Sequence, residues 1–201
     1  MLVYPDAIPP KKKLTNERLS ADTWIDGAMR LLIEKSADAV RVEVLAKELG
    51  VTKGSFYWHF KDRDDLLESV LRTWRERTTS GIIERVNSQT GDAQSRLHSL
   101  FALPNRSAAA VEGAALELAI RAWARRNAQA RAAVDAVDEE RLRYTASLCR
   151  ELGYSEDEAQ ARAFVGYAYL IAESLMRNQG TDRAKKFRRR FVEVELLKIK
   201  N

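Results

Sequence analysis

The stretch Val42–Phe60, VEVLAKELGVTKGSFYWHF, decides how this chain folds near its N-terminal end. Val42, Leu45 and Leu49 share one apolar helix face. Ala46 is small enough for a second helix to cross closely. Gly50 follows where the chain must turn, and glycine reaches a positive φ at little steric cost. The pattern predicts a helix over 42–49 and a second helix that begins after Thr52 and ends near Phe60.

Val51 and Phe56 are placed to pack the second helix back onto the first, which predicts a helix-turn-helix. Its outer face carries hydrogen-bonding, cationic and aromatic groups: Thr52, Lys53, Ser55, Tyr57, Trp58 and His59. Such groups suit phosphates and base edges. Gly54 lowers helix propensity by about 1 kcal/mol, and its missing Cβ would let the helix approach a DNA backbone. The segment therefore predicts DNA binding.

The flanking sequence predicts a helix on each side of this unit. Ser20 is placed to cap a helix whose buried face carries Trp24, Ile25, Ala28, Leu31 and Leu32. Asp62 is placed to cap a longer helix that runs to about Val86. Its apolar positions are Leu66, Leu67, Val70, Leu71 and Trp74.

Beyond Gly91 the pattern stays helical, without strand alternation or an internal repeat. The expected helices cover about 92–103, 110–125, 127–152, 156–177 and 182–198, with a break at 103–107 around Pro104. Gly153 and Gly180 are the predicted stops, and Ser155 with Glu158 predicts a capping box. The last helix carries a basic cluster over 183–190, which fits a solvated face. The expected fold class is all-α.

Composition limits the classes of protein that fit. The chain has 201 residues, 45% of them hydrophobic, enough for one large or two small domains. The 34 Lys and Arg exceed the 29 Asp and Glu, a mild excess that permits nucleic acid as a partner. Cys149 is the single cysteine, which fits a small buried side chain in a reducing cytoplasm. The longest nearly apolar stretch, Ala163–Ala172, is too short for a membrane span, so export and membrane insertion are not expected.

Little in the sequence indicates catalysis. The two histidines, His59 and His98, have no partner at metal-ligand or catalytic-triad spacing. The acidic cluster of Asp62, Asp64 and Asp65 fits the positive end of a helix better than a cation loop. No glycine-rich phosphate loop occurs. We therefore expect no enzyme activity, no cofactor and no metal.

The run LGVTKGSFYWHFKDRDDLL at 49–67 closely resembles the DNA-binding segment of TetR-family regulators. The shared features are the Gly-Val turn, Thr-Lys-Gly-Ser, an aromatic pair, His-Phe, and a charged cap before Asp-Leu-Leu. The resemblance covers about residues 20–72 and implies an N-terminal three-helix DNA-binding domain followed by a larger helical ligand-binding and dimerisation domain. We expect a basic arm at 1–13 with Lys11–Lys13, a helix-turn-helix domain at 14–62 and a regulatory domain at 63–201.

Carried over position by position, the resemblance implies a role for each residue of the recognition segment. Lys53 and Trp58 would face the major groove, and His59 would pack beside the DNA backbone. Phosphate contacts would come from Thr52, Ser55, Tyr57 and Lys61. Two positions depart from the family: Ser36 stands where a glycine is usual, and Arg41 stands where Ser or Thr caps the second helix. The lost cap is worth about 1 kcal/mol, and Arg41 could instead reach a phosphate.

The helix over 163–176 is apolar on nearly every side, and a monomer of this size can hardly surround it. The helix over 127–152 carries a parallel apolar stripe, so the two helices and their symmetry mates are expected to form a four-helix dimer interface. The family resemblance points the same way. The expected interface residues are Val134, Val137, Leu148, Leu152, Phe164, Gly166, Tyr167, Ala168, Ile171 and Leu175.

The family resemblance also implies a small-molecule cavity in the C-terminal region, where a few polar groups stand among aromatic ones. The candidate lining residues are Trp74, His98, Phe101, Glu117, Ile120, Trp123, Tyr144 and Phe164. The chain is thus expected to be a cytoplasmic, homodimeric, ligand-responsive repressor that binds a palindromic double-stranded operator. The alternative is a DNA-binding regulator whose C-terminal domain responds to a protein partner.

Overall fold

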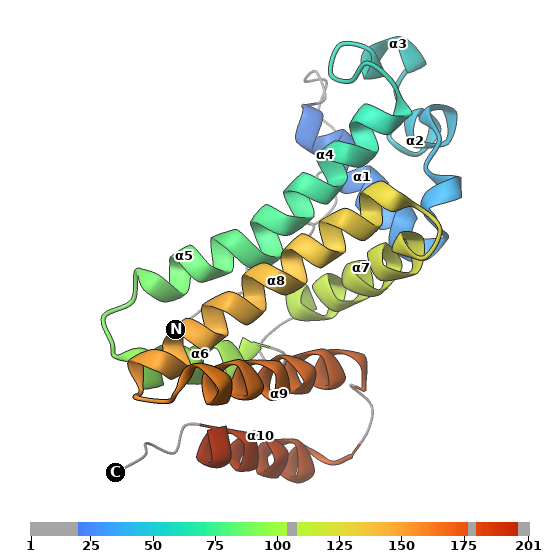
Figure 1. The fold of residues 1–201 in the computed structure, drawn as a ribbon. Coiled ribbons are helices and arrows are strands. Elements are labelled where there is room, and N and C mark those ends of the chain that lie inside the picture. The colour runs from blue at the N-terminus through green and yellow to red at the C-terminus, as the bar shows by residue number, and fades with distance from the viewer. Residues whose placement is uncertain (1–19, 104–107, 177–179, 197–201) are drawn as a thin grey trace. The chain divides into compact units, whose positions relative to one another are not determined.

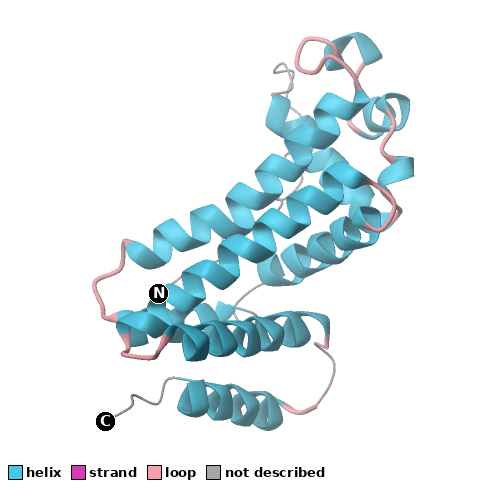
Figure 2. Ribbon diagram, in the orientation of Figure 1, coloured by secondary structure: helices cyan, strands magenta, loops and turns pink. Residues whose placement is uncertain are grey.

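The computed structural model describes residues 20–103, 108–176 and 180–196, and these ranges contain helices and no β-strand (Figures 1 and 2). The all-α fold class is therefore confirmed. The predicted arm with Lys11–Lys13 and the break around Pro104 lie outside the described residues. None of the described helices combines the length and the apolar character that crossing a membrane requires.

The chain divides into two compact units. Of the described residues, the N-terminal unit contains those from 20 to 78 together with Glu112–Asp135, and the C-terminal unit contains those between Thr79 and Val111 and those from Ala136 to 196. The helix-turn-helix belongs to the N-terminal unit. The boundary that we predict between residues 62 and 63 divides the chain by role, and it stays a prediction.

The N-terminal unit begins with helix α1, Ala21–Glu34. Ser20 caps it as expected, because its side chain accepts a hydrogen bond from the backbone N–H of Thr23 at 3.3 Å. The residues expected on the inner face are all buried: Trp24, Ile25, Ala28, Leu31 and Leu32. A short 3-10 turn, η1, follows at Ala37–Ala39.

The helix-turn-helix consists of α2, Val42–Glu48, and α3, Lys53–Phe56. Gly50 adopts a φ of 67° between them, as expected for a turn that favours glycine. Regular α3 ends before the predicted end near Phe60. The backbone N–H groups of His59 and Phe60 both donate to the carbonyl of Phe56, at 2.9 and 3.1 Å, so the last residues form a tightened turn.

Aromatic packing joins the helix-turn-helix to α1. Phe56 is fully buried, and its ring meets that of Trp24 edge-on at a centroid distance of 5.3 Å. Phe60 is 5% exposed and lies 5.4 Å from Phe56. Helix α4, Arg63–Arg75, packs along α1 and buries Leu66, Leu67, Val70, Leu71 and Trp74 (Figure 1). The predicted core of this unit is confirmed.

Side chains hold the ends of α2 and α4. The carboxylate of Asp62 accepts from the backbone N–H of Asp65 at 2.9 Å, so the predicted cap of α4 is confirmed. Arg41 forms no side-chain cap of α2, and its guanidinium donates instead to the carbonyl of Asp38 at 3.2 Å. The guanidinium of Arg63 donates to the carbonyls of Val40 and Ala37 at 2.6 and 2.7 Å. Arg63 thereby satisfies two backbone acceptors just before α2.

The helical backbone continues beyond α4 through a π-helical segment, η2, Glu76–Ser80, into α5, Gly81–Asn87. The predicted helix over 62–86 is therefore confirmed as one helical run with a local change of register. Four of the following helices are α6, Ala93–Phe101; α7, Ala108–Ala124; α8, Ala128–Glu151; and α9, Glu156–Leu175. The last described helix is α10, Asp182–Leu196.

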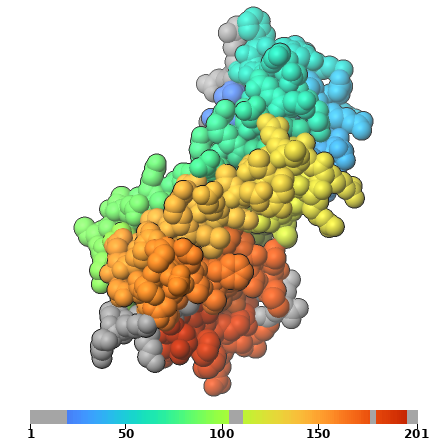
Figure 3. Space-filling model, in the orientation of Figure 1, coloured from blue at the N-terminus to red at the C-terminus, as the bar shows by residue number. Residues whose placement is uncertain are grey.

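Two of the predicted signals at the ends of the C-terminal helices are confirmed, and a third is not. Gly153 has a φ of 88° just after α8, as expected for a stop. Helix α9 ends at Leu175 with Met176 as its C-cap, so Gly180, whose φ is 86°, does not end that helix. Ser155 and Glu158 form the capping box of α9, in which the backbone N–H of Ser155 donates to the Glu158 carboxylate at 3.3 Å. Helices α9 and α10 lie side by side (Figures 1 and 3).

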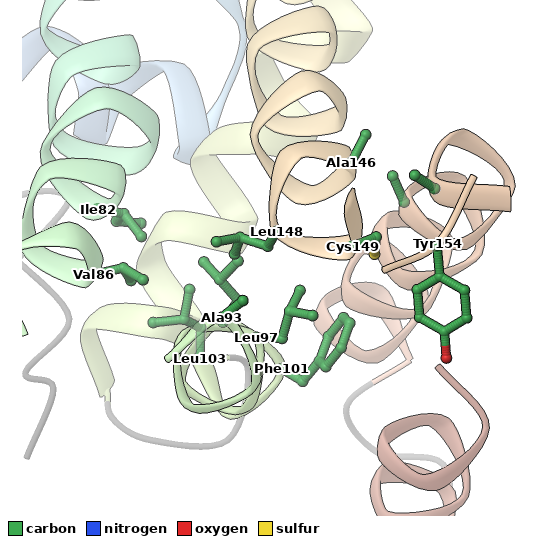
Figure 4. Close-up of a cluster of buried hydrophobic side chains, with 13 residues drawn as sticks. Ile82, Val86, Ala93, Leu97, Phe101, Leu103, Ala146, Leu148, Cys149 and Tyr154 are labelled. Atoms are coloured by element: carbon green, nitrogen blue, oxygen red, sulfur yellow. The ribbon is translucent and has the colours of Figure 1, made fainter. Parts of the chain in front are cut away.

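The C-terminal unit has its own hydrophobic core, to which α5, α6, α8 and α9 contribute (Figure 4). Leu97, Phe101 and Leu148 are each at most 1% exposed. Cys149 lies in the same cluster, and burial raises the pKa of its thiol. The cysteine is thus a buried apolar side chain, as the sequence predicts.

A buried ion pair connects α1 to the π-helical segment within the N-terminal unit. Arg77 Nη1 lies 2.6 Å from Asp26 Oδ1, and the two side chains are 21% and 11% exposed. Burial raises the pKa of Asp26 even though the hydrogen bond and charge of Arg77 act in the opposite direction. Removal of Arg77 alone would leave a buried carboxylate without this partner.

We predict that Arg77→Ala lowers the free energy of unfolding by about 3 kcal/mol, because a buried charge loses its partner. Urea denaturation followed by circular dichroism measures this loss. Arg72→Ala is the control, since Arg72 is exposed on α4, which leads into the π-helical segment, and its substitution should cost less than about 0.5 kcal/mol. Equal losses in the two variants would contradict the prediction.

Candidate nucleic-acid interface

The α2–α3 segment separates its side chains into an inner and an outer set. Phe56 and Phe60 are buried, whereas Ser55 is half-buried. The other residues predicted to contact DNA are all exposed: Arg41, Thr52, Lys53, Gly54, Tyr57, Trp58, His59 and Lys61. They come from α3, from the residues that flank it, and from the residue just before α2.

Two large aromatic side chains stand out on this surface. Trp58 is 87% exposed and Tyr57 is 62% exposed. The ring of Tyr57 meets that of buried Phe56 edge-on, with the ring centroids 5.2 Å apart. Neither side chain owes its position to burial in the protomer, so both are available to a ligand outside it.

The cationic groups around these aromatics are held in different ways. Lys53 Nζ lies 2.8 Å from a carboxylate oxygen of Glu43 on α2. Lys61 is exposed, and its backbone N–H donates to the Asp65 carboxylate at 2.8 Å, which fixes the residue at the start of α4. Positive charge and exposed rings therefore lie together on one short segment.

Gly54 has no structural reason to be glycine within the protomer. A Cβ built on it would come no nearer than 3.7 Å to Thr52 Oγ1, which is an ordinary contact, and its φ is not positive. Alanine would therefore fit and would favour the helix by about 1 kcal/mol. The missing side chain leaves room for a partner to approach the backbone of α3.

Among the described residues, no three His, Cys, Asp or Glu side chains are grouped so that they could hold a metal ion. The exposed aromatic and cationic side chains on a short second helix instead define a helix-turn-helix DNA-binding domain. Residues 25–70 match the family described as "Bacterial regulatory proteins, tetR family". Residues 25–70 therefore form a DNA-binding domain of the tetR type.

Curated relatives match a limited part of the chain. An uncharacterized HTH-type transcriptional regulator, YwcC of Bacillus subtilis, is 31% identical over 71 residues, 34% of this chain and 32% of the relative. The class D tetracycline repressor protein of Escherichia coli is 36% identical over 53 residues, 26% of this chain and 24% of the relative. The matches thus span about a third or less of these relatives.

Solved structures match most of the chain at low identity. A transcriptional regulator from Rhodococcus sp. Rha1 superposes with a TM-score of 0.69 at 18% identity, covering 90% of this chain and 96% of the other. FadR from Bacillus subtilis, in complex with stearoyl-CoA, gives 0.62 at 18% identity, covering 90% and 100%. At such identities the likeness shows the fold, an N-terminal helix-turn-helix followed by a helical C-terminal domain.

The predicted ligand-lining residues are divided between the two units. In the N-terminal unit, Trp74 and Ile120 are fully buried, Trp123 is half-buried, and Glu117 forms an ion pair with Arg121 at 2.8 Å. Their common role in ligand binding stays a prediction.

In the C-terminal unit, Phe101 belongs to the hydrophobic core, and half-buried Tyr144 donates from its hydroxyl to Asn87 at 2.7 Å. Burial raises the pKa of Tyr144. His98 is exposed, with Nδ1 3.4 Å from Glu193, and Phe164 is 65% exposed. His98 and Phe164 are therefore open to solvent rather than enclosed within the described protomer.

The C-terminal unit also contains a polar cluster that the sequence analysis missed. Arg141 donates to Thr79 Oγ1 at 3.0 Å and lies 3.1 Å from the hydroxyl of Tyr167. That hydroxyl donates to Asp138 at 2.5 Å, and Ser80 donates to Glu140 at 2.9 Å. Asp138, Arg141 and Thr145 recur at helical spacing on α8, which is the signal that could have revealed a polar face.

We predict that Trp58→Ala relaxes sequence preference, because loss of a base contact removes about 1 to 3 kcal/mol of discrimination. Lys53→Ala should act likewise. Lys61→Ala and Tyr57→Phe should weaken all DNA sequences alike, and Lys61→Ala should flatten the slope of log affinity against log salt by about 0.9.

Fluorescence anisotropy with selected and scrambled duplexes measures these four variants. An unchanged ratio of the two affinities in Trp58→Ala would show that Trp58 does not read bases. A salt slope that Lys61→Ala leaves unaltered would rule out a phosphate contact by Lys61.

Proposed function

We propose that this protein is a sequence-specific transcriptional repressor that binds a palindromic operator as a homodimer and releases it in response to an effector. The observation that carries the proposal is the exposure of Trp58 and Tyr57 beside Lys53 and Lys61 on the helix-turn-helix. Its relatives include a protein named tetracycline repressor, which supports repression rather than activation. We assign its action to the cytoplasm, where bacterial DNA lies.

The deciding experiment is selection of bound fragments from a genomic DNA library, followed by affinity measurements on the enriched sequence. We expect the enriched sequence to be a near palindrome with half-sites about 34 Å apart, because two recognition helices enter successive major grooves. Equal affinity for enriched and scrambled duplexes would refute sequence-specific binding.

The exposed face of α9 supports the homodimer. This face carries apolar residues at the spacing of a helix-packing seam: Ala161, Phe164, Val165, Ala168, Ala172, Leu175 and Met176. Phe164, Val165 and Leu175 are 65%, 53% and 46% exposed. Small alanines between them permit close approach of a second helix, and a contiguous apolar patch of this kind marks an interface.

Other residues predicted for the interface have different surroundings. Val134, Val137, Leu148 and Gly166 are buried within their own protomer, so they are not part of the exposed surface that a partner would contact. Leu152, Tyr167 and Ile171 are half-buried. The surface that remains for the partner is the outer face of α9.

Helix α10, whose basic cluster over 183–190 is predicted to form a solvated face, extends this surface with apolar residues. Phe187, Phe191 and Val194 are 71%, 59% and 51% exposed. They recur at i, i+4 and i+7, the spacing of one helix face. Since α9 and α10 pack against each other, two helices of each protomer can contribute to a four-helix interface.

We predict that Ala168→Glu produces a monomer, because a carboxylate would be desolvated in the apolar interface. The monomer should lose operator affinity, since its recognition helix no longer has a partner at a set distance. Analytical ultracentrifugation measures the assembly. Ala132→Glu is the control, because Ala132 is exposed on α8 outside the stripe. A dimeric Ala168→Glu variant would overturn this interface.

We assign effector sensing to the chain beyond residue 62. Two proteins of the same fold support a small-molecule effector. One is a regulator from Saccharomonospora viridis solved in complex with choline, and the other is FadR of Bacillus subtilis solved in complex with stearoyl-CoA. The alternative occupant is a protein partner. A thermal-shift screen of metabolites with and without operator DNA separates them, because a true effector stabilises the protein and lowers its operator affinity.

The helical run from α4 to α5 is suited to carry the signal. It follows the recognition helix directly, and its π-helical segment is bonded at both ends. Arg77 pairs with Asp26 of α1, while Thr79 and Ser80 bond to side chains of α8. Since π-helical turns are local departures in helix register, this segment can absorb a shift of the helix.

Trp74 lies two residues before this segment and is fully buried. Its indole N–H has no hydrogen-bond partner among the described residues, so a phenylalanine there loses no such bond. Trp74→Phe can therefore test signalling without removing a buried hydrogen bond.

We predict that Trp74→Phe and Trp74→Ala reduce the effector response more than they change operator affinity without effector. The response is the ratio of operator affinities with and without saturating effector, which corresponds to about 1 to 3 kcal/mol in a working switch. Anisotropy titrations measure it. An unchanged ratio in both variants, together with its loss in Trp123→Ala or Phe101→Ala, would show that the signal takes another route.

A further inference from the structure

The recognition surface contains one acidic contact that DNA binding does not explain. Glu43 lies in the first turn of α2, and its carboxylate accepts a hydrogen bond from Lys53 Nζ at 2.8 Å. The side chains of Lys53 and Glu43 are 57% and 60% exposed. The first residue of α3 is thus tied to α2 by a solvent-exposed ion pair.

Folding stability is a weak reason for this pair. Exposed ion pairs contribute little, because water screens the attraction and two long side chains lose freedom. DNA binding alone would also disfavour Glu43, since a carboxylate repels the phosphate backbone. The hydrogen bond from Lys53 lowers the pKa of Glu43, so the carboxylate is charged at neutral pH.

The geometry explains what the pair can do. A lysine ammonium has three donors on a flexible stem and can reach a phosphate or a base edge. The contact with Glu43 occupies one donor and restrains the stem, and the exposed Lys53 side chain can still be reached by a DNA group. Non-specific complexes depend on phosphate contacts, whereas specific complexes add base contacts. A restraint that keeps the Lys53 ammonium away from phosphates therefore weakens non-specific complexes more than specific ones.

We propose that Glu43 is a specificity-determining residue that acts through Lys53: it holds the ammonium toward base edges and suppresses its contacts with phosphates. Glu43 is a positioning residue in this role, and it supplies the repulsive element that specific recognition needs. The proposal rests on the proposed function in one respect, namely that α3 binds DNA.

The test is Glu43→Gln, which keeps the size of the side chain and removes its charge. We expect affinity for scrambled DNA to rise by at least about threefold and its salt slope to steepen by about 0.9, because Lys53 gains a phosphate contact. Operator affinity should change less, so the ratio of operator to scrambled affinity falls. Glu43→Asp keeps the charge and should preserve most of that ratio.

Glu48→Gln is the matched control. Glu48 lies on the same helix, is similarly exposed and pairs with Lys35 at 3.9 Å. The Glu48→Gln substitution removes the same charge from α2 but leaves the contact between Lys53 and Glu43 in place. If the two glutamine variants shift the ratio equally, the effect is one of net charge and the proposal is wrong.

A double-mutant cycle with Lys53→Ala completes the test. In the Lys53→Ala background, Glu43→Gln should no longer change the ratio, because no ammonium remains to be positioned. A change that persists there overturns the proposal. The melting temperatures of all variants should differ from that of the wild type no more than is usual for surface substitutions. A changed affinity ratio then reflects the position of Lys53 and not a loss of folding.

The wild-type protein separates this proposal from the proposed function. Wild type that does not distinguish operator from scrambled DNA refutes the proposed function itself. Wild type that distinguishes them, with an unchanged ratio in Glu43→Gln, refutes only the role of Glu43.

Discussion

The burial of Phe56 against Trp24 is the contact on which the helix-turn-helix depends. Regular α3 covers only Lys53–Phe56, and a helix of this length has no stability of its own. It exists because Phe56 and Phe60 dock into the core beneath it. Since successive residues of a helical turn point in different directions, the same docking turns Tyr57 and Trp58 outward. The inner and outer faces are therefore two results of one packing event.

Arginine side chains form hydrogen bonds and ion pairs between elements that are distant in the chain. Arg63 binds two carbonyl groups ahead of α2, where the chain lacks a side-chain cap. Arg77 neutralises the buried Asp26 and thereby joins α1 to the π-helical segment. In the C-terminal unit, Arg141 connects α8 to Thr79 and Tyr167. Each of these bonds joins residues far apart in the chain. Because hydrogen bonds are directional and apolar packing is not, these bonds fix the relative positions of the elements that they connect.

Local signals predicted the helices well, because caps, glycines and apolar periodicity act over a few residues. Ser20, Asp62 and the Ser155–Glu158 pair begin helices where expected, and Gly50 turns the chain. The outer set of the recognition segment was likewise readable, since its neighbours Phe56 and Phe60 had to point inward. The surroundings of the C-terminal residues were not readable in this way. Periodicity shows that a helix has an apolar face, but it does not say which neighbour covers that face.

The sequence by itself therefore determined the all-α fold class, the helix-turn-helix and the exposed character of its recognition residues, because these follow from local pattern and one buried aromatic pair. Only the tertiary structure decided that Val134 and Val137 are buried within the protomer, that Phe164 and Phe187 are exposed, and that Lys53 meets Glu43. These outcomes depend on how helices distant in the chain pack and on where long side chains end. The tertiary structure sets such contacts, because the apolar pattern of one helix says neither which neighbour covers its face nor where a long side chain ends.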